Sequence, residues 1–386
     1  MPEVRAAIAG IGASTFSKDS GKTELGLAID AIEDALDDAG IERAAVDGMV
    51  TYTVDETDEI DLGRTMGLGN LTFFSRVPHG GGGSCGTVHQ AVLAVASGAA
   101  EVVVCYRSIN GRSGKRLGAA DRPPRSGSAA RSTWYKPFGL GTPAQRVALI
   151  AQRYAHEYGA TSEDFGRITV LARQHAATNP KAIFHGKPIT LADHQASRWI
   201  AEPLRLLDCC LETDAAVAIV VTSVERARAS RHGAVLIKAA AQGIAPNQES
   251  MASYYRPVIS GLPSMGVVAD QLWAQSGLRP ADIQVANLYD HFTPYVLMQL
   301  EELGFCGRGE AAAFVADGHL ELTGSLPANT NGGLLGEAYV HGMNGISEGV
   351  RQVRGTAVTQ VPDVAHALVT AGTGVPTSGL VLGRDG

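Results

Sequence analysis

The sequence has fewer basic than acidic residues. The 386 residues include 32 Lys and Arg against 39 Asp and Glu, which gives a formal net charge of −7. Sequence-independent binding to nucleic acid depends on clustered basic side chains that displace counterions from the phosphates. We therefore expect no nucleic-acid partner.

Cysteines and long apolar runs are also scarce. The five cysteines, at positions 85, 105, 209, 210 and 306, are odd in number and contain no CxxC pair. They predict neither a disulfide framework nor a metal site. No apolar run approaches the roughly 18 residues of a membrane helix, and the first residues lack the pattern of a secretion signal. We expect a cytoplasmic protein without a membrane span.

Aromatic residues make up only 6% of the chain, whereas glycine is abundant, with 46 residues. Glycine at this level favours tight turns and close backbone packing. With 45% hydrophobic and 18% charged residues, the chain has the composition of a globular protein. Disordered and coiled-coil structures are therefore excluded, and an α/β protein is favoured.

Hydrophobic periodicity predicts alternating strands and helices. Residues 25–39 carry the i, i+3, i+4 spacing of an amphipathic helix that stops at Gly40, before a strand over 46–54. Residues 87–97 are apolar on nearly every face, which is typical of a buried helix, and a strand begins at 101. A polar, basic excursion over about 109–135 precedes two more helices, at 142–158 and 162–177.

The second half of the chain repeats the first in outline. Segments 37–52 and 274–289 align at a constant offset, which matches Gly40 with Gly277 and Tyr52 with Tyr289. Both read as the end of a helix, a glycine stop and a strand. A duplicated architecture follows.

The first candidate site is the glycine run that precedes the buried helix. Gly81, Gly82 and Gly83 expose backbone N–H groups that can face a developing oxyanion, although tight packing also explains such a run. Cys85 follows the run and has His79 and His89 nearby. Because buried cysteine usually behaves as a small hydrophobe, we favour a packing role over a nucleophile.

Two polar clusters complete the set of candidate residues. One ends an apolar strand at 288–293, and the other lies in a glycine-rich segment at 332–345. Ends of strands are where α/β proteins place their chemistry. The clusters supply Tyr289, Asp290, His291, Glu337, Tyr339, His341 and Asn344.

These motifs, together with GGGGSCGTVHQAVLAVASGAAEVVV and LDCCLETDAAVAIVVTS, resemble the thiolase superfamily, in its lipid-transfer-protein and sterol-carrier-protein branch. The resemblance covers nearly the whole chain. It implies a thiolase fold, with duplicated βαβαβ halves in a layered αβαβα architecture. The halves would span residues 1–230, with a loop and helical insertion at about 109–200, and residues 231–386.

The family's catalytic groups are missing at the matching positions. The nucleophilic cysteine falls on Gly81, and the His-Asp-Cys-Phe motif becomes Tyr289-Asp290-His291-Phe292. The histidine of the Gly-His-Pro motif falls on Tyr339, and the second cysteine falls near Thr370. A thiolase needs a thiolate to accept the acyl group, so thioester exchange is not expected.

The pattern resembles the steroid side-chain aldolases of actinobacteria within this superfamily. That resemblance implies a lyase acting in cholesterol catabolism. It would cleave a 17-hydroxy steroid acyl-CoA of the 17-hydroxy-3-oxo-pregnene-carboxyl type to a 17-keto steroid and propionyl-CoA, without a cofactor or metal. Tyr289 and Tyr339 would be the proton-transfer pair, with support from His291, His341, Asp290, Glu337 and Asn344.

The same resemblance implies a homodimer joined to a small partner that combines a zinc ribbon with an OB fold, giving a heterotetramer. The basic excursion, with Arg112, Lys115, Arg116, Arg122, Arg125 and Arg131, would contact the CoA phosphates or the partner, or form a solvated loop. The alternative function is that of a non-catalytic protein that carries acyl-CoA or lipid. It also agrees with the loss of the cysteine.

Overall fold

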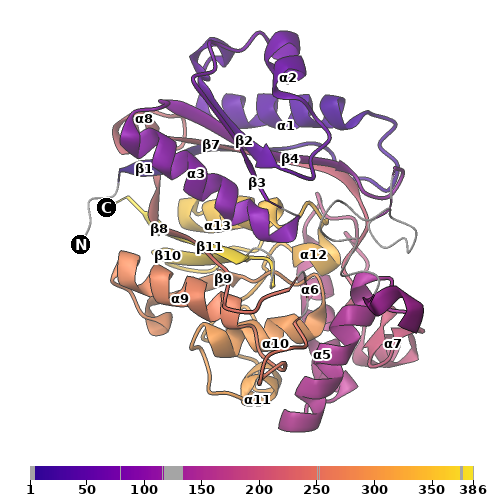
Figure 1. Cartoon of the computed structure of the whole chain (residues 1–386). Coiled ribbons are helices and arrows are strands. Elements are labelled where there is room, and N and C mark those ends of the chain that lie inside the picture. Colours follow the sequence, from indigo (N-terminus) through magenta and orange to yellow (C-terminus); the bar gives the residue numbers. More distant parts are fainter. Residues whose placement is uncertain are drawn as a thin grey trace.

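A computed structural model describes residues 5–78, 80–114, 116, 134–249, 251, 253–373 and 377–385. Most of the basic excursion lies outside these residues, including Lys115, Arg122, Arg125 and Arg131, as does His79. In the described part, helices alternate with strands in layers (Figure 1).

One nine-stranded sheet runs through the molecule, in the order β3-β2-β4-β7-β1-β8-β11-β10-β9. Its strands are β1 (Ala6–Ala13), β2 (Gly48–Tyr52), β3 (Phe73–Val77), β4 (Val102–Asn110), β7 (Asp214–Ser223), β8 (Val235–Gly243), β9 (Val285–Asn287), β10 (His366–Ala371) and β11 (Thr377–Arg384). Strands β1, β2, β3, β4 and β7 form one part of the sheet, and β8 to β11 form the other. The two parts join where β1 pairs with β8, with Ala7 opposite Leu236 and Ile8 opposite Val235. A two-stranded sheet, β5 (Trp199–Ala201) and β6 (Leu204–Arg205), lies apart.

The helices form layers around this sheet. They are α1 (Glu24–Ala39), α2 (Glu59–Met66), α3 (Ser84–Ser97), α5 (Pro143–Tyr158), α6 (Ser162–Thr178), α7 (Leu191–Ala196), α8 (Val224–Arg228), α9 (Pro263–Ser276), α10 (Thr293–Glu302), α11 (Ala311–Ala316), α12 (Gly333–Gly336) and α13 (Met343–Arg354). In Figure 1, α1 covers one outer face, α3 and α13 lie in the middle, and α9 and α10 cover the other outer face.

Three clusters of buried side chains fill the spaces between the layers. One joins α1 to the outer face of β1, β4 and β7, the second surrounds α3 and α13, and the third lies under α9 and α10. This arrangement confirms the layered αβαβα architecture expected from the sequence. Helices α5, α6 and α7 are inserted between β4 and β7, and α6 packs against α10, α11 and α12. The division of the chain at residue 230, between α8 and β8, stays a prediction.

The repeated segment folds in the same way in both halves. Helix α1 ends at Gly40, with φ of 68°, and α9 ends at Gly277, with φ of 70°. This left-handed conformation suits glycine, which has no Cβ to clash. A short 3₁₀ turn and a strand follow in each case, β2 in the first half and β9 in the second. The repeat therefore places Tyr52 and Tyr289 at equivalent ends of two strands.

No helix in the described part of the chain has both the length and the apolar character that a bilayer crossing requires.

Candidate active site

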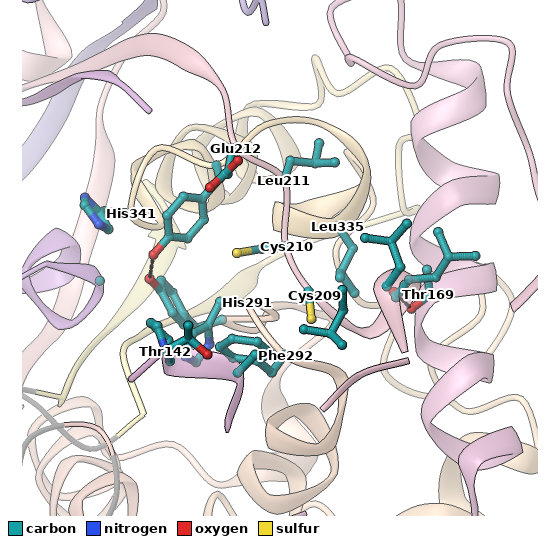
Figure 2. Close-up of a pocket in the computed structure, with 18 of the residues that line it drawn as sticks. Thr142, Thr169, Cys209, Cys210, Leu211, Glu212, His291, Phe292, Leu335 and His341 are labelled. Atoms are coloured by element: carbon teal, nitrogen blue, oxygen red, sulfur yellow. Dashed lines mark hydrogen bonds between the residues drawn. The ribbon is translucent and has the colours of Figure 1, made fainter. Parts of the chain in front are cut away.

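A cavity of about 750 Å³ lies where the central layer, the C-terminal half and the inserted helices meet. Its lining includes Gly81, Tyr289, His291, Tyr339 and His341. In Figure 2, His341 lies at one side of this cavity, across from Leu335 and Thr169. The fold thus gathers five of the ten candidate residues around one space.

Tyr289 and Tyr339 are in direct contact. Their hydroxyl oxygens lie 3.1 Å apart, and either group can be the donor. Tyr289 follows β9, and its backbone N–H donates to Thr370 Oγ1 at 3.0 Å. Tyr339 lies between α12 and α13, where its N–H donates to Thr213 Oγ1 and its carbonyl accepts from the same hydroxyl. Hydrogen bonds to Thr370 and Thr213 therefore hold the backbone in place at both tyrosines.

Both phenols are neutral at pH 7. Burial raises the pKa of Tyr289 well above its usual value, and the neighbouring Tyr339 raises it further. Burial likewise raises the pKa of Tyr339, although the hydrogen bond with Tyr289 and the charge of Arg107 oppose the rise. A resting phenolate is therefore disfavoured at both positions, and the pair is better suited to pass a proton than to hold a negative charge.

Gly81 leaves the space that the Tyr289 hydroxyl occupies. A Cβ added at Gly81 would lie 1.7 Å from the Tyr289 oxygen. Gly81–Gly83 form a 3₁₀ turn that leads into α3 at Ser84. Gly82 and Gly83 are buried, and the Gly82 carbonyl accepts from Ser378 Oγ at 2.6 Å. Of the three glycines, Gly81 lines the cavity, and the oxyanion role stays a prediction.

The two histidines at the cavity differ in their surroundings. Burial lowers the pKa of His291 to about 3, so its imidazole is neutral at physiological pH. Its Nε2 lies 3.3 Å from Thr373 Oγ1. His341 instead accepts a hydrogen bond at Nδ1 from Arg107 Nε, at 2.9 Å. His341 also has a φ of 51°, which is uncommon for a residue with a Cβ.

Asp290, Glu337 and Asn344 do not line the large cavity. The Glu337 carboxylate accepts from the side-chain amides of Asn179, Asn331 and Asn344. Asp290 and Asn344 border a second cavity of about 10 Å³, a space for about one water molecule. These three residues support the segments that carry the tyrosines.

Asp290 is a buried carboxyl with an unusual affinity for its proton. Its Oδ1 accepts from the Leu334 backbone N–H at 2.8 Å, and Oδ2 has no hydrogen-bond partner among the described residues. Burial raises the pKa of this carboxyl to about 7, and the backbone bond only partly opposes the rise. Asp290 therefore changes charge near neutral pH.

Cys85 lies inside α3, and its side chain is buried, as the sequence predicts. Its Sγ lies 3.7 Å from the Val369 carbonyl oxygen. Burial raises the pKa of the thiol, which disfavours the thiolate that a nucleophile requires. Cys85 is therefore a packing residue.

Sequence reasoning missed two buried charges beside the site, Arg107 in β4 and Asp55 after β2. They form an ion pair of 2.7 Å, with side chains that are 3% and 0% exposed. The signal that could have found Arg107 is its place in the apolar run VVVCYRSIN, because a charge inside a buried strand needs a partner.

Basic side chains gather on the cavity wall. The lining includes Lys18, Arg112, Arg116, Arg173 and Arg198. The acidic residue in the same lining is Glu212, which accepts from Arg116 Nε at 2.7 Å. Two members of the predicted basic excursion, Arg112 and Arg116, therefore border the cavity.

The chain is similar to known proteins of the thiolase fold. Residues 248–384 match the family model described as thiolase C-terminal domain-like. The chain is 63% identical to the steroid side-chain-cleaving aldolase of Thermomonospora curvata, over 98% of each chain. It is 61% identical to the 17-hydroxy-3-oxo-4-pregnene-20-carboxyl-CoA lyase of Mycobacterium tuberculosis, over 98% of this chain and 99% of that protein.

A solved structure, the Ltp2-ChsH2(DUF35) aldolase, superposes with a TM-score of 0.95 at 62% identity, covering 99% of this chain and 98% of that one. Identity at this level over nearly the whole chain excludes a different fold or family. The chain therefore belongs to the thiolase-fold family that includes these steroid side-chain-cleaving aldolases.

Proposed function

We propose that this protein is a carbon–carbon lyase that cleaves the side chain of a steroid β-hydroxy acyl-CoA by a retro-aldol reaction. The products are a 17-keto steroid and propionyl-CoA. One observation carries the proposal: two neutral tyrosine hydroxyls are in contact at 3.1 Å, beside Gly81. By resemblance, these three residues take the positions of thiolase catalytic groups. The names of the relatives with 61% and 63% identity support the same reaction.

Acyl exchange has no nucleophile at this position. A thiolase-type reaction forms a bond between a thiolate and the acyl carbon. Gly81 offers no side chain, and Cys85 is buried with a raised pKa. A retro-aldol cleavage needs no covalent intermediate, which suits a cavity lined by hydroxyl and imidazole groups.

The tyrosine pair supplies a proton relay. The substrate hydroxyl gives its proton to one phenol, that phenol gives its own proton to the other, and the second phenol protonates the α-carbon. The electron pair of the broken C–C bond enters the thioester enolate and then forms the new C–H bond. The electron pair of the broken O–H bond forms the second bond between carbon and oxygen in the ketone. Each phenol accepts one proton and releases one, so no phenolate accumulates in surroundings that disfavour it.

The cavity suits an acyl-CoA in the charge of its lining and has room for part of such a ligand. Its volume of about 750 Å³ is in the range of sites that bury drug-sized ligands, which are smaller than a steroid acyl-CoA. We assign the phosphates of CoA to the basic wall formed by Lys18, Arg112, Arg173 and Arg198, and the steroid to the apolar wall near Leu335 and Phe292. Arginine and lysine are the usual partners of phosphate.

We also propose that the protein forms a homodimer that binds a small zinc-ribbon and OB-fold partner in the cytoplasm. The solved relative is named as an aldolase with a DUF35 partner, which supports the partner. The edge strand β3 carries Phe74 with 69% of its surface exposed, which suits pairing with a second copy. All five cysteines are free thiols, in keeping with a reducing compartment.

The test is to replace each tyrosine separately, Tyr289→Phe and Tyr339→Phe, and to measure propionyl-CoA release with the partner present. Tyr255→Phe is a matched control, because that ring is 71% exposed and outside the cavity lining. Each site variant should lose at least about 100-fold in kcat, the usual contribution of a proton-transfer group, and the control should lose nothing.

Unchanged turnover in both site variants would refute the assignment. A single-turnover experiment on the wild type separates the carrier alternative, which predicts that the acyl-CoA binds and no ketone or propionyl-CoA forms.

A further inference from the structure

Arg107 is a cation that is buried near the tyrosine pair. Arg107 lies in β4, with 3% of its side chain exposed, and its charge is balanced by Asp55, whose side chain is fully buried. Taking two charges out of water is costly in free energy, and well-packed apolar residues often stabilise a fold as well or better. Stability therefore does not explain why this pair is present.

The guanidinium joins Asp55 to the cavity. Its Nη1 donates to Asp55 Oδ2 at 2.7 Å, and its Nε donates to His341 Nδ1 at 2.9 Å. Asp55 is itself fixed, because Oδ2 also accepts from the Ser108 N–H and Oδ1 accepts from the N–H and hydroxyl of Thr57. The planar guanidinium, held on one side, sets the direction of its bond to His341 on the other.

This bond decides which nitrogen of His341 carries the proton. Arginine remains protonated in proteins, so Nε must be the donor and His341 Nδ1 the acceptor. A neutral His341 therefore has its proton on Nε2. His341 lines the cavity, and its Nε2 lies 3.0 Å from the position that a Cβ on Gly80, another lining residue, would take. The His341 ring is 5.1 Å from the ring of Tyr339.

The backbone at His341 is consistent with a position held for function. Its φ of 51° is left-handed, and Gly342 follows with a φ of 89°. A non-glycine residue in this region is strained and persists only when its surroundings hold it there. The bond from Arg107 and the ring of Tyr52, 6.0 Å away, are two of those constraints.

We propose that Arg107 is a positioning residue for the C–C cleavage, which fixes His341 as a neutral Nε2–H donor to the thioester oxygen. This inference rests on the proposed retro-aldol function. As the C–C bond breaks, its electron pair moves into the enolate and negative charge develops on that oxygen. His341 stabilises the charge by a hydrogen bond and transfers no proton, so the relay through the tyrosines keeps its balance.

The kinetic test is a double-mutant cycle between Arg107→Lys and His341→Ala. Lysine keeps a positive charge for Asp55 but has no planar fork to reach both partners. We expect His341→Ala to lower kcat by about 100-fold. Arg107→Lys should lower kcat by about 10- to 100-fold, with KM changed less than about threefold, and should have almost no further effect in the His341→Ala background.

Equal losses of kcat from Arg107→Lys in both backgrounds would overturn the proposal, as would a normal kcat in Arg107→Lys. Thermal unfolding of each variant separates a folding defect from a catalytic one. If Tyr289→Phe and Tyr339→Phe keep full activity, the proposed function fails. If these variants are inactive while Arg107→Lys is normal, the positioning role alone fails.

A spectroscopic test is independent of activity. In protein with ¹⁵N-labelled histidine, the His341→Ala variant identifies the His341 resonances. We expect Nδ1 to resonate as an unprotonated nitrogen and Nε2 as a protonated one, and we expect this preference to be lost in Arg107→Lys. A wild-type spectrum with the proton on Nδ1 would overturn the inference.

Discussion

The hydroxyl of Tyr289 occupies the space that a side chain at Gly81 would need. A Cβ at residue 81 would lie 1.7 Å from the Tyr289 oxygen and 2.4 Å from the ring carbon that carries it, far inside contact distance. The chain can therefore hold a side chain at residue 81 or the Tyr289 ring in its present place, but not both. By resemblance, residue 81 is the position of the thiolase nucleophile.

Replacing Gly81 should disable the site without unfolding the protein. In Gly81→Ala the methyl group displaces the Tyr289 hydroxyl from Tyr339, and we expect kcat to fall at least about 100-fold. Gly26→Ala is the matched control, because its Cβ would meet ordinary contacts, the nearest at 3.5 Å. Steady-state kinetics and thermal unfolding of both variants test this. Full activity in Gly81→Ala would show that catalysis does not need the contact between Tyr289 and Tyr339.

Cys85→Ala should leave turnover within about twofold of the wild type. The thiol is buried in α3 and does not line the cavity, so its removal costs packing, about 1 kcal/mol in the free energy of unfolding. Assays of propionyl-CoA release and urea unfolding measure the two effects. Loss of turnover with an unchanged fold would indicate that Cys85 acts as an acyl acceptor.

Asp290 should make the wild type less stable as pH rises. The folded carboxyl keeps its proton to a pKa of about 7, whereas the ordinary value is 3.8. Between these values the native state binds more protons than the unfolded state, so the free energy of unfolding falls with increasing pH. Asp290→Asn does not titrate, and its stability relative to the wild type should rise by a few kcal/mol from pH 4 to pH 8, since one pKa unit is worth about 1.4 kcal/mol.

Urea unfolding at pH 4, 6 and 8 measures this difference. The exposed Asp270→Asn serves as a control and should show no such trend. A constant difference between Asp290→Asn and the wild type across the range would contradict the buried, protonated state of Asp290.

Charge reversal on the cavity wall should weaken substrate binding. Arg198 is exposed and borders the cavity, so Arg198→Glu should raise KM for the acyl-CoA several-fold with little change in kcat. The increase should shrink at high salt, which screens exposed charges. Arg279, whose side chain is 86% exposed, lies outside the cavity lining, and Arg279→Glu should leave KM unchanged. Equal effects of the two changes would argue against a phosphate site at Arg198.

The sequence allowed individual helices and strands to be predicted because their signals are local. The stop at Gly40, its repeat at Gly277 and the apolar helix before Gly98 each depend on neighbouring residues, and the structure has all three. The architecture itself came from resemblance, which the layers around the sheet confirm.

The site was predictable in part. Resemblance placed Tyr289 and Tyr339 at catalytic positions, but only the fold brings two residues 50 positions apart to a distance of 3.1 Å. The other polar residues of the same clusters are all buried, and they differ in whether they line the cavity. Glu337 turned inward because three amides satisfy its carboxylate there. Arg107, in β4, and Asp55, after β2, are far apart in the sequence and gave no joint signal along the chain.

The crowding between residues 81 and 289 also makes two kinds of chemistry mutually exclusive. A cysteine at residue 81 and the Tyr289 ring in its present place cannot coexist. A single substitution at residue 81 would therefore not add a thiolase nucleophile to the tyrosine pair, because the new side chain would displace the ring that forms the pair.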